Sequence, residues 1–346
     1  MQPYEHGGNI YTGTPVICDY SSNLNPLGMP EAVRRALTED PSRFEKYPDP
    51  SCTELRRAIA AFHGLDPEDV LPGSGADDLI YRLCTVLRPE KVLLTAPSFS
   101  EYAKSALASG AELKYHLLEE SEGFAVTETF LEDITEDVGL VWLCTPNNPT
   151  GRTVSPAILR RAAEKCQELG ILLVLDECFL CFSGQPSCTA WLSEFSCLAV
   201  LDAFTKRFAM AGLRLGYLMS GDRELLRRLR DGAPCWSVSG PAQACGIAAL
   251  ADPRPYLEKS LRIIGEERPW LQRRLTELGM KVYAPEANYV FFRSPVPLLE
   301  PLREKGYLIR SCDNYPGLGD GYYRICVHTH ENNENLIDAL REVLHG

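Results

Sequence analysis

The chain has 346 residues, which is long enough for about two domains and for a core that encloses a small molecule. Asp and Glu number 47 against 35 Lys and Arg, so the formal net charge is −12. Without a long basic tract, nucleic acid and anionic membrane surfaces are not expected partners. The odd count of 13 cysteines favours reduced thiols over a disulfide framework. No signal-peptide pattern or long apolar run occurs, so we expect a soluble cytoplasmic protein.

Short aliphatic or β-branched runs alternate with helix-length stretches along the first two thirds of the chain. Ser155 and Pro156 begin an amphipathic stretch that stops at Gly170, which predicts a helix over residues 156–168. The runs themselves predict strands at residues 92–95, 140–144, 171–175 and 198–201. This alternation indicates an α/β fold with a mostly parallel sheet that helices cover on both faces.

A region of different character begins near residue 239. Helical stretches run to Leu278 with a break at residues 253–255. Strand patterns follow at residues 289–292, 306–309 and 322–327, with a last helix at residues 333–344. We expect a large α/β domain over residues 40–238, and a smaller α+β domain built from residues 1–39 and 239–346.

Two residues near the ends of central strands could carry chemistry. Lys206 lies between the strand ending at residue 201 and the glycine-containing residues 212–217, which indicates a buried turn. Most lysines lie on the surface, but burial would lower the pKa of this amine toward the neutral nucleophile that forms a Schiff base. Asp176 ends the strand 171–175, where a carboxylate either caps a helix or meets a ligand at the carboxyl edge of the sheet.

Four further motifs have an ordinary structural interpretation beside a functional one, and only the string at Asn148 is much more specific than a turn signal. The glycines of residues 73–77 precede an apolar helix, whose free N–H groups could cradle a phosphate. Arg214 could add a bidentate charge there or form an ordinary ion pair. Phe99 could stack on a ligand ring or belong to the core. Asn148, in the string Asn-Asn-Pro-Thr-Gly, could shape a turn or donate to a ring oxygen.

Together these residues supply what pyridoxal 5'-phosphate requires of a protein. The cofactor needs an amine for its aldehyde, a carboxylate for its ring nitrogen, a donor for its ring oxygen and an arginine for its phosphate. We therefore predict a pyridoxal-phosphate protein on the joint occurrence of the motifs in chain order. The histidines show no spacing typical of metal ligands, so no metal is expected.

On these motifs the sequence resembles the fold-type-I pyridoxal-phosphate enzymes of the aminotransferase fold, in the branch of histidinol-phosphate aminotransferase and threonine-phosphate decarboxylase. The resemblance covers nearly the whole chain and is greater to the decarboxylase. The segments that carry this preference are residues 6–10, 19–30, 236–238, 309–318 and 322–324. The resemblance implies decarboxylation of a phosphorylated amino acid, L-threonine O-3-phosphate, to aminopropanol phosphate in cobalamin biosynthesis.

The resemblance also implies roles at the cofactor. Lys206 would be the Schiff-base lysine, Asp176 the partner of the pyridine nitrogen and Asn148 the donor to the ring oxygen. Phe99 would stack on the ring. The cofactor phosphate would be bound by Gly75, Ala76, Thr205, Arg214 and, from the neighbouring subunit of a homodimer, Tyr47.

At the substrate, the resemblance implies that Arg324 grips the carboxylate. The positions that match the surroundings of the substrate phosphate are His6, Gly7, Asn23 and Arg310, and Asn148 is also expected to bind the substrate. Two guanidiniums and a histidine suit a substrate with both a carboxylate and a phosphate.

Two departures from the family pattern and two alternatives stay open. Ala203 stands where the family often has a hydroxyl on the cofactor phosphate, which implies either a weaker affinity for that phosphate or compensation by Thr205 and Tyr47. Phe179 replaces the tyrosine that many aminotransferases place beside the ring oxygen, which favours decarboxylation. The same chemical groups serve transamination, so histidinol-phosphate aminotransferase or another phosphate-recognising aminotransferase of class I or II is the alternative. A non-enzymatic cofactor-binding module is disfavoured by the intact lysine, and threonine phosphate differs from serine phosphate by one methyl.

Overall fold

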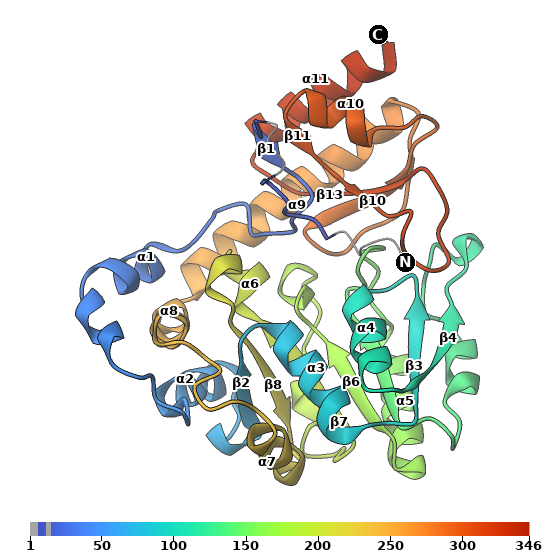
Figure 1. Cartoon of the computed structure of the whole chain (residues 1–346). Helices are drawn as coiled ribbons and strands as arrows, with labels where there is room; N and C mark the ends of the chain where they lie inside the picture. The colour runs from blue at the N-terminus through green and yellow to red at the C-terminus, as the bar shows by residue number, and fades with distance from the viewer. Residues whose placement is uncertain (1–5, 12–14, 346) are drawn as a thin grey trace.

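The computed structural model describes residues 6–11 and 15–345, and its largest element is a seven-stranded sheet (Figure 1). The strands lie in the order β2 (Val70–Gly73), β8 (Gly216–Ser220), β7 (Leu198–Ala203), β6 (Leu172–Asp176), β5 (Leu140–Cys144), β3 (Lys91–Ala96) and β4 (Glu112–Leu117). Only β8 runs antiparallel to its neighbours. The carboxyl ends of β2, β7, β6, β5 and β3 therefore meet at one edge of the sheet, where open α/β sheets bind ligands.

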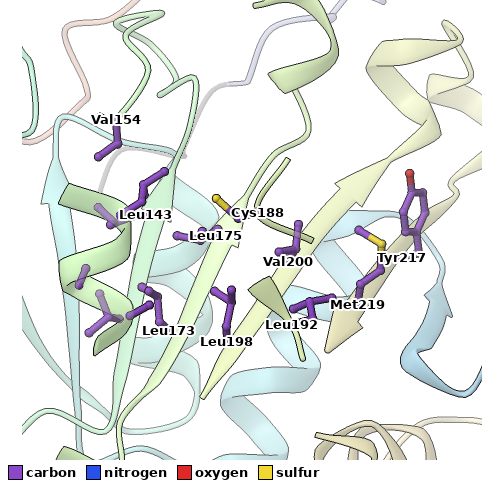
Figure 2. Packing of buried hydrophobic residues seen from close by; sticks show 14 of the residues in the cluster. Leu143, Val154, Leu173, Leu175, Cys188, Leu192, Leu198, Val200, Tyr217 and Met219 are labelled. Carbon is purple, nitrogen blue, oxygen red and sulfur yellow. The ribbon is translucent and has the colours of Figure 1, made fainter. Parts of the chain in front are cut away.

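Helices cover both faces of this sheet, which confirms the predicted fold class. One face packs against α3 (Ala76–Leu87), α4 (Ser100–Ala108) and α7 (Arg223–Asp231) through a core that contains Trp142 and Val174. The other face packs against α5 (Pro156–Leu169). Figure 2 shows that second core, in which alternate residues of the strands, such as Leu173 and Leu175 of β6, point to the same side.

The predicted strands and the predicted helix lie where the patterns placed them, within a few residues. Helix α5 begins at Pro156, and Gly170 ends it in the left-handed region with a φ of 68°. Ser155 occupies the N-cap position, but its side chain accepts no capping hydrogen bond. The start of this helix therefore depends on Pro156 and on packing rather than on the serine hydroxyl.

A second, antiparallel sheet lies near the carboxyl end of the chain. Its strands are β12 (Arg310–Ser311), β13 (Tyr322–Cys326), β10 (Tyr289–Arg293) and β9 (Lys281–Val282), in that order. Helices α9 (Arg254–Glu277), α10 (Leu299–Glu304) and α11 (His330–His345) accompany it (Figure 1). The N-terminal β1 (Cys18–Asp19) pairs in parallel with β11 (Tyr307–Leu308), so a segment near the start of the chain joins the C-terminal region here.

The segments that connect the two sheets pack against the larger one. Helix α8 (Gly240–Ala251) contacts α1 (Glu31–Thr38) and α2 (Thr53–His63). Val33 of α1 and Ala242 of α8 belong to the core below the seven-stranded sheet. The domain boundaries proposed after residues 39 and 238 stay a prediction. Across residues 6–11 and 15–345, no helix has the length and apolar character needed to cross a bilayer.

Glu120 connects the antiparallel sheet to the seven-stranded sheet through hydrogen bonds. It follows β4, and its Oε1 accepts hydrogen bonds from the Lys281 ammonium at 2.6 Å and from the Tyr283 hydroxyl. Its Oε2 accepts from the Tyr322 hydroxyl at 3.0 Å. The bonds from Lys281 and Tyr283 lower the pKa of Glu120 from its ordinary value of 4.5 to about 2. The contact therefore depends on an ionised carboxylate.

We expect Glu120→Gln to lower the thermal stability at neutral pH, and the loss to vanish in acid. A carboxylate with a lowered folded-state pKa contributes stability that is present above its unfolded pKa and is lost as the pH falls through the folded one. The difference in Tm between the two proteins, measured from about pH 6 to about pH 3, should therefore shrink as the pH falls. Glu119→Gln, at an exposed neighbour, is the control, and a difference that does not depend on pH would contradict the assignment.

Candidate active site

Lys206 lies at the carboxyl edge of the large sheet, on the one-turn helix α6 (Phe204–Arg207) directly after β7. The expected buried turn is thus a short helix, and the lysine is partly accessible to solvent. Its Nζ lies 5.8 Å from the centre of the Phe179 ring. Burial lowers the pKa of the Lys206 amine, and the positive charge of Arg324 lowers it further. The surroundings therefore favour the neutral amine that acts as a nucleophile.

Buried polar contacts that the sequence did not reveal fix this helix. Asn25 donates its backbone N–H to the carbonyl of Lys206 at 3.2 Å and its amide to that of Arg207 at 2.9 Å. The guanidinium of Arg207 pairs with Asp202, which also accepts from the Tyr217 hydroxyl at 2.9 Å. Asp202 and Arg207 are both buried. The two residues beside Ala203 and Lys206 therefore form an internal ion pair instead of a ligand contact.

Asp176, the last residue of β6, is buried beneath the same edge. Its carboxylate accepts from the Tyr102 hydroxyl at 2.5 Å and from the Cys178 N–H at 2.9 Å. Burial raises the pKa of Asp176, and the bond from Tyr102 opposes that rise. The Tyr102 ring stacks on Trp142 and meets Phe99 edge to face at 5.5 Å. Tyr102 was missed from the sequence, although its position three residues after Phe99 places both on one face of α4.

The glycines before α3 lie against Arg214. Gly75 caps the helix at a φ of 87°, and a Cβ added there would lie 2.7 Å from Nη2 of Arg214. A Cβ on Gly216 would lie 2.6 Å from the backbone nitrogen of Ala76. Arg214 is exposed and pairs with Asp77 at 2.9 Å. A helix N-terminus and a guanidinium thus converge where only glycine fits, an arrangement suited to a phosphate.

Asn148 and Arg324 are in contact above this edge. The Asn148 Oδ1 accepts from Nη1 of Arg324 and from the Tyr315 hydroxyl at 3.4 Å. Nη2 of Arg324 donates to the carbonyl of Ser21 at 2.7 Å. Within the described residues no hydrogen bond engages the amide nitrogen of Asn148. That nitrogen is the group with which it could donate to a ligand.

Arg310 and Arg324 face each other across the pairing of β12 with β13. They are only 7% and 5% exposed, and the Nε of each has no partner within the described part of the chain. Arg310 donates to the Asn314 amide at 2.8 Å, and neither arginine forms an ion pair with a carboxylate among the described residues. Buried like charges at opposite positions are unfavourable. An anionic ligand would relieve this repulsion.

The remaining predicted residues differ in how far they are exposed to solvent. Asn23 is 1% exposed, and neither atom of its amide has a partner in the described structure. His6 and Gly7 line a cavity of about 490 Å³ together with Arg310. Tyr47, in contrast, is 80% exposed and stacks on Trp236 at 4.5 Å. Thr205 adjoins Lys206 on α6 and is partly buried.

Residues 16–340 match the sequence profile of the family described as aminotransferase class I and II. The chain belongs to this family. It is 36% identical to the threonine-phosphate decarboxylase of Salmonella typhimurium, over 99% of this chain and 97% of that protein. It is 30% identical to a histidinol-phosphate aminotransferase of Methanococcus maripaludis, over 95% of this chain and 90% of that protein.

Among solved structures, the histidinol-phosphate aminotransferase of Clostridium acetobutylicum superposes with a TM-score of 0.87 at 29% identity, over 94% of this chain and 98% of that one. Enzymes of the family use pyridoxal 5'-phosphate. Relatives with both names match along the whole chain at comparable identity, so the comparison establishes the branch that the two enzymes share.

We expect Tyr102→Phe to weaken the binding of pyridoxal 5'-phosphate by roughly tenfold. The change removes one hydrogen bond to a carboxylate, worth about 1.5 kcal/mol, and keeps the stacking on Trp142. Titration of the apoprotein with the cofactor, followed by absorbance, measures the affinity. Tyr256→Phe, which removes a hydroxyl bonded to the carbonyl of Gly28, is the control, and equal affinities for both variants would contradict a role of Tyr102 beneath the cofactor.

Proposed function

We propose that the chain is a pyridoxal-phosphate-dependent decarboxylase of a phosphorylated amino acid. L-threonine O-3-phosphate is the proposed substrate and aminopropanol phosphate, an intermediate of cobalamin biosynthesis, the product. The observation that carries this proposal is the buried pair of Arg310 and Arg324, opposite each other and without a carboxylate partner among the described residues. Two such cations suit a substrate that carries a carboxylate and a phosphate on a short carbon chain.

The residues present fit the cofactor. Lys206 would bond its aldehyde, Asp176 would pair with its ring nitrogen, and Phe99 would lie against its ring. The backbone at Gly75 and Ala76, with Arg214 and Thr205, would hold its phosphate. The close approach of Arg214 to Gly75, which leaves no room for a Cβ, supports this. When bound, pyridoxal 5'-phosphate supplies an aldehyde for amines and a ring that accepts electrons from a bond at the substrate's α-carbon.

Arg324 would bind the substrate carboxylate and set its direction. The carbonyl of Ser21 and the amide of Asn148 hold its two terminal nitrogens. A guanidinium fixed in this way can hold a carboxylate in one orientation, and the bond at the α-carbon that stands perpendicular to the ring is the one that breaks. Lys206 Nζ would take up a proton from the ammonium group of the substrate and deliver it to the α-carbon after carbon dioxide leaves; burial and Arg324 lower its pKa, which makes the protonated amine a ready donor.

A second candidate is transamination by a phosphate-recognising aminotransferase. The structural match to the Clostridium acetobutylicum aminotransferase and the identity to archaeal histidinol-phosphate aminotransferases favour it. The greater identity to threonine-phosphate decarboxylase favours decarboxylation. Phe179 also favours decarboxylation, because it places a ring without a hydroxyl against Tyr289 and beside Lys206.

The purified protein with cofactor should release carbon dioxide from threonine phosphate and form no glutamate from histidinol phosphate and 2-oxoglutarate. Serine phosphate, one methyl shorter, should react more slowly by roughly 10- to 100-fold, the usual worth of a methyl group in a fitted pocket. Lys206→Ala should abolish turnover while the cofactor still binds, whereas Lys305→Ala, at a surface ion pair, should not. Glutamate as the sole product would establish the aminotransferase instead.

The proposed assembly is a homodimer in which Tyr47 reaches the cofactor phosphate of the neighbouring subunit. Tyr47 is exposed although it is a large aromatic side chain, and its ring contacts Trp236, which is also exposed. Such a pair of surface aromatics is typical of an interface.

Mixing Tyr47→Ala with Lys206→Ala subunits should restore activity that neither variant has alone. A mixed dimer contains one site with an intact lysine and the partner's intact tyrosine, so random exchange would return about a quarter of the normal activity. Light scattering should give the mass of a dimer throughout. Activity no higher than the mean of the two parents, in a preparation that exchanges subunits, would contradict a shared site.

A further inference from the structure

Glu101 is a buried carboxylate next to the proposed site that the proposed mechanism does not use. It is 7% exposed and lies in the first turn of α4, two residues after Phe99. Its oxygens accept from His6 Nε2 at 2.7 Å, from Lys104 at 2.9 Å and from the Tyr81 hydroxyl at 3.2 Å. Burial would raise the pKa of Glu101, but the bonds from His6 and Lys104 outweigh it and bring the pKa to about 2. Glu101 is therefore ionised at neutral pH.

An ionised Glu101 determines which nitrogen of His6 is available to a ligand. A carboxylate can only accept hydrogen bonds, so the Nε2 of His6 must carry a proton. Nδ1 is then the ring nitrogen left to meet another group, and it donates to a phosphate oxygen when it also carries a proton, since both nitrogens of a protonated histidine are donors. The His6 ring also packs on Phe99, with their centres 5.9 Å apart. Two contacts from the start of α4 thus set the orientation of a side chain that is otherwise half exposed.

Gly7 and Gly8, which follow His6, pack against Ser21. A Cβ on Gly7 would lie 2.1 Å from the carbonyl oxygen of Ser21, so only glycine fits. The N–H of Gly8 donates to the Ser21 hydroxyl at 2.7 Å. The carbonyl of Ser21 also accepts from Arg324. Residues 6–8 therefore span from the substrate arginine to the helix of the cofactor-stacking aromatic.

This short span borders the cavity of about 490 Å³ that Arg310 lines from the other side. Of the groups on its wall, Arg310 is buried with an unpartnered Nε. His6 lies at the same cavity with its Nδ1 not engaged by Glu101. A phosphate is the anion that an arginine and a histidine at one cavity would bind.

We propose that Glu101 is a positioning residue that holds the imidazole of His6 at the cavity where the substrate phosphate binds. It acts through His6 and touches neither substrate nor cofactor. The inference rests on the proposed function only in that the ligand carries a phosphate. One turn of α4 would then orient two groups of the proposed site: Glu101 orients His6, and Tyr102 donates a hydrogen bond to Asp176 on the cofactor side.

Glu101→Gln tests this role because it keeps the shape of the side chain and removes its charge. KM for threonine phosphate should rise about tenfold, the worth of one hydrogen bond to a charged group, while kcat stays within about twofold. The Kd of the holoenzyme for inorganic phosphate, measured by calorimetry, should rise by the same factor. The matched control is Glu267→Gln, since Glu267 is 8% exposed and accepts from His330 at 2.9 Å away from the site. It should leave KM and the phosphate Kd unchanged, whatever it does to Tm.

A double-mutant cycle with His6→Ala separates positioning from a general structural effect. If Glu101 acts through His6, His6→Ala alone and the double variant should have the same phosphate Kd. Additive effects, or a phosphate Kd that Glu101→Gln or His6→Ala leaves unchanged, would overturn the inference. Failure of the proposed reaction is visible separately, as glutamate formation by the unaltered enzyme. In that case the same cycle is run on KM for histidinol phosphate.

Discussion

The repulsion between Arg310 and Arg324 is the constraint on which the proposed site depends. The pairing of β12 with β13 sets these residues opposite each other, and burial deprives them of water. Neutral acceptors hold them in place: Asn314 for Arg310, and Asn148 with the Ser21 carbonyl for Arg324. Neutral acceptors leave the charge uncompensated, so binding of an anion is favoured at this position. Burial lowers the pKa of Lys206, and the charge of Arg324 lowers it further.

The two sheets meet the needs of this arrangement in different ways. The parallel strands of the large sheet bring residues distant in sequence to one edge, because each strand ends there before its helix begins. Asp176, Lys206 and Asn148 all follow such ends. The antiparallel sheet contributes Arg324 from the middle of β13 and Arg310 from the start of β12. The Glu120 contacts with Tyr283 and Tyr322 hold this sheet against the large layer. A separation of the two layers would therefore remove the arginines from the lysine.

The sequence was sufficient for those features that depend on local order along the chain. Alternating runs predicted the strands, the glycine and asparagine-proline strings that follow two of them pointed to Gly75 and Asn148, and the end of an apolar strand pointed to Asp176. Contacts between distant segments were not predictable in this way. Tyr102 and Glu101 are ordinary helix residues until the fold places Asp176 and His6 beside them. Likewise, the pairing of Asp202 with Arg207 and the approach of Gly7 to Ser21 depend on backbone positions that no short motif encodes.

Helix α4 shows how groups that do not react could select the reaction. Phe99 is its N-cap residue, and Glu101 and Tyr102 lie in its first turn; the three lie against the proposed ring site, His6 and Asp176 respectively. A rigid turn fixes the distance between the place of the ring and the place of the substrate phosphate. In the proposed site, His6 and Arg310 would fix the phosphate end of the substrate and Arg324 its carboxylate end, which would leave little freedom to rotate about the α-carbon. The choice between losing carbon dioxide and losing a proton would then follow from these fixed separations, because only the bond held perpendicular to the ring is weakened.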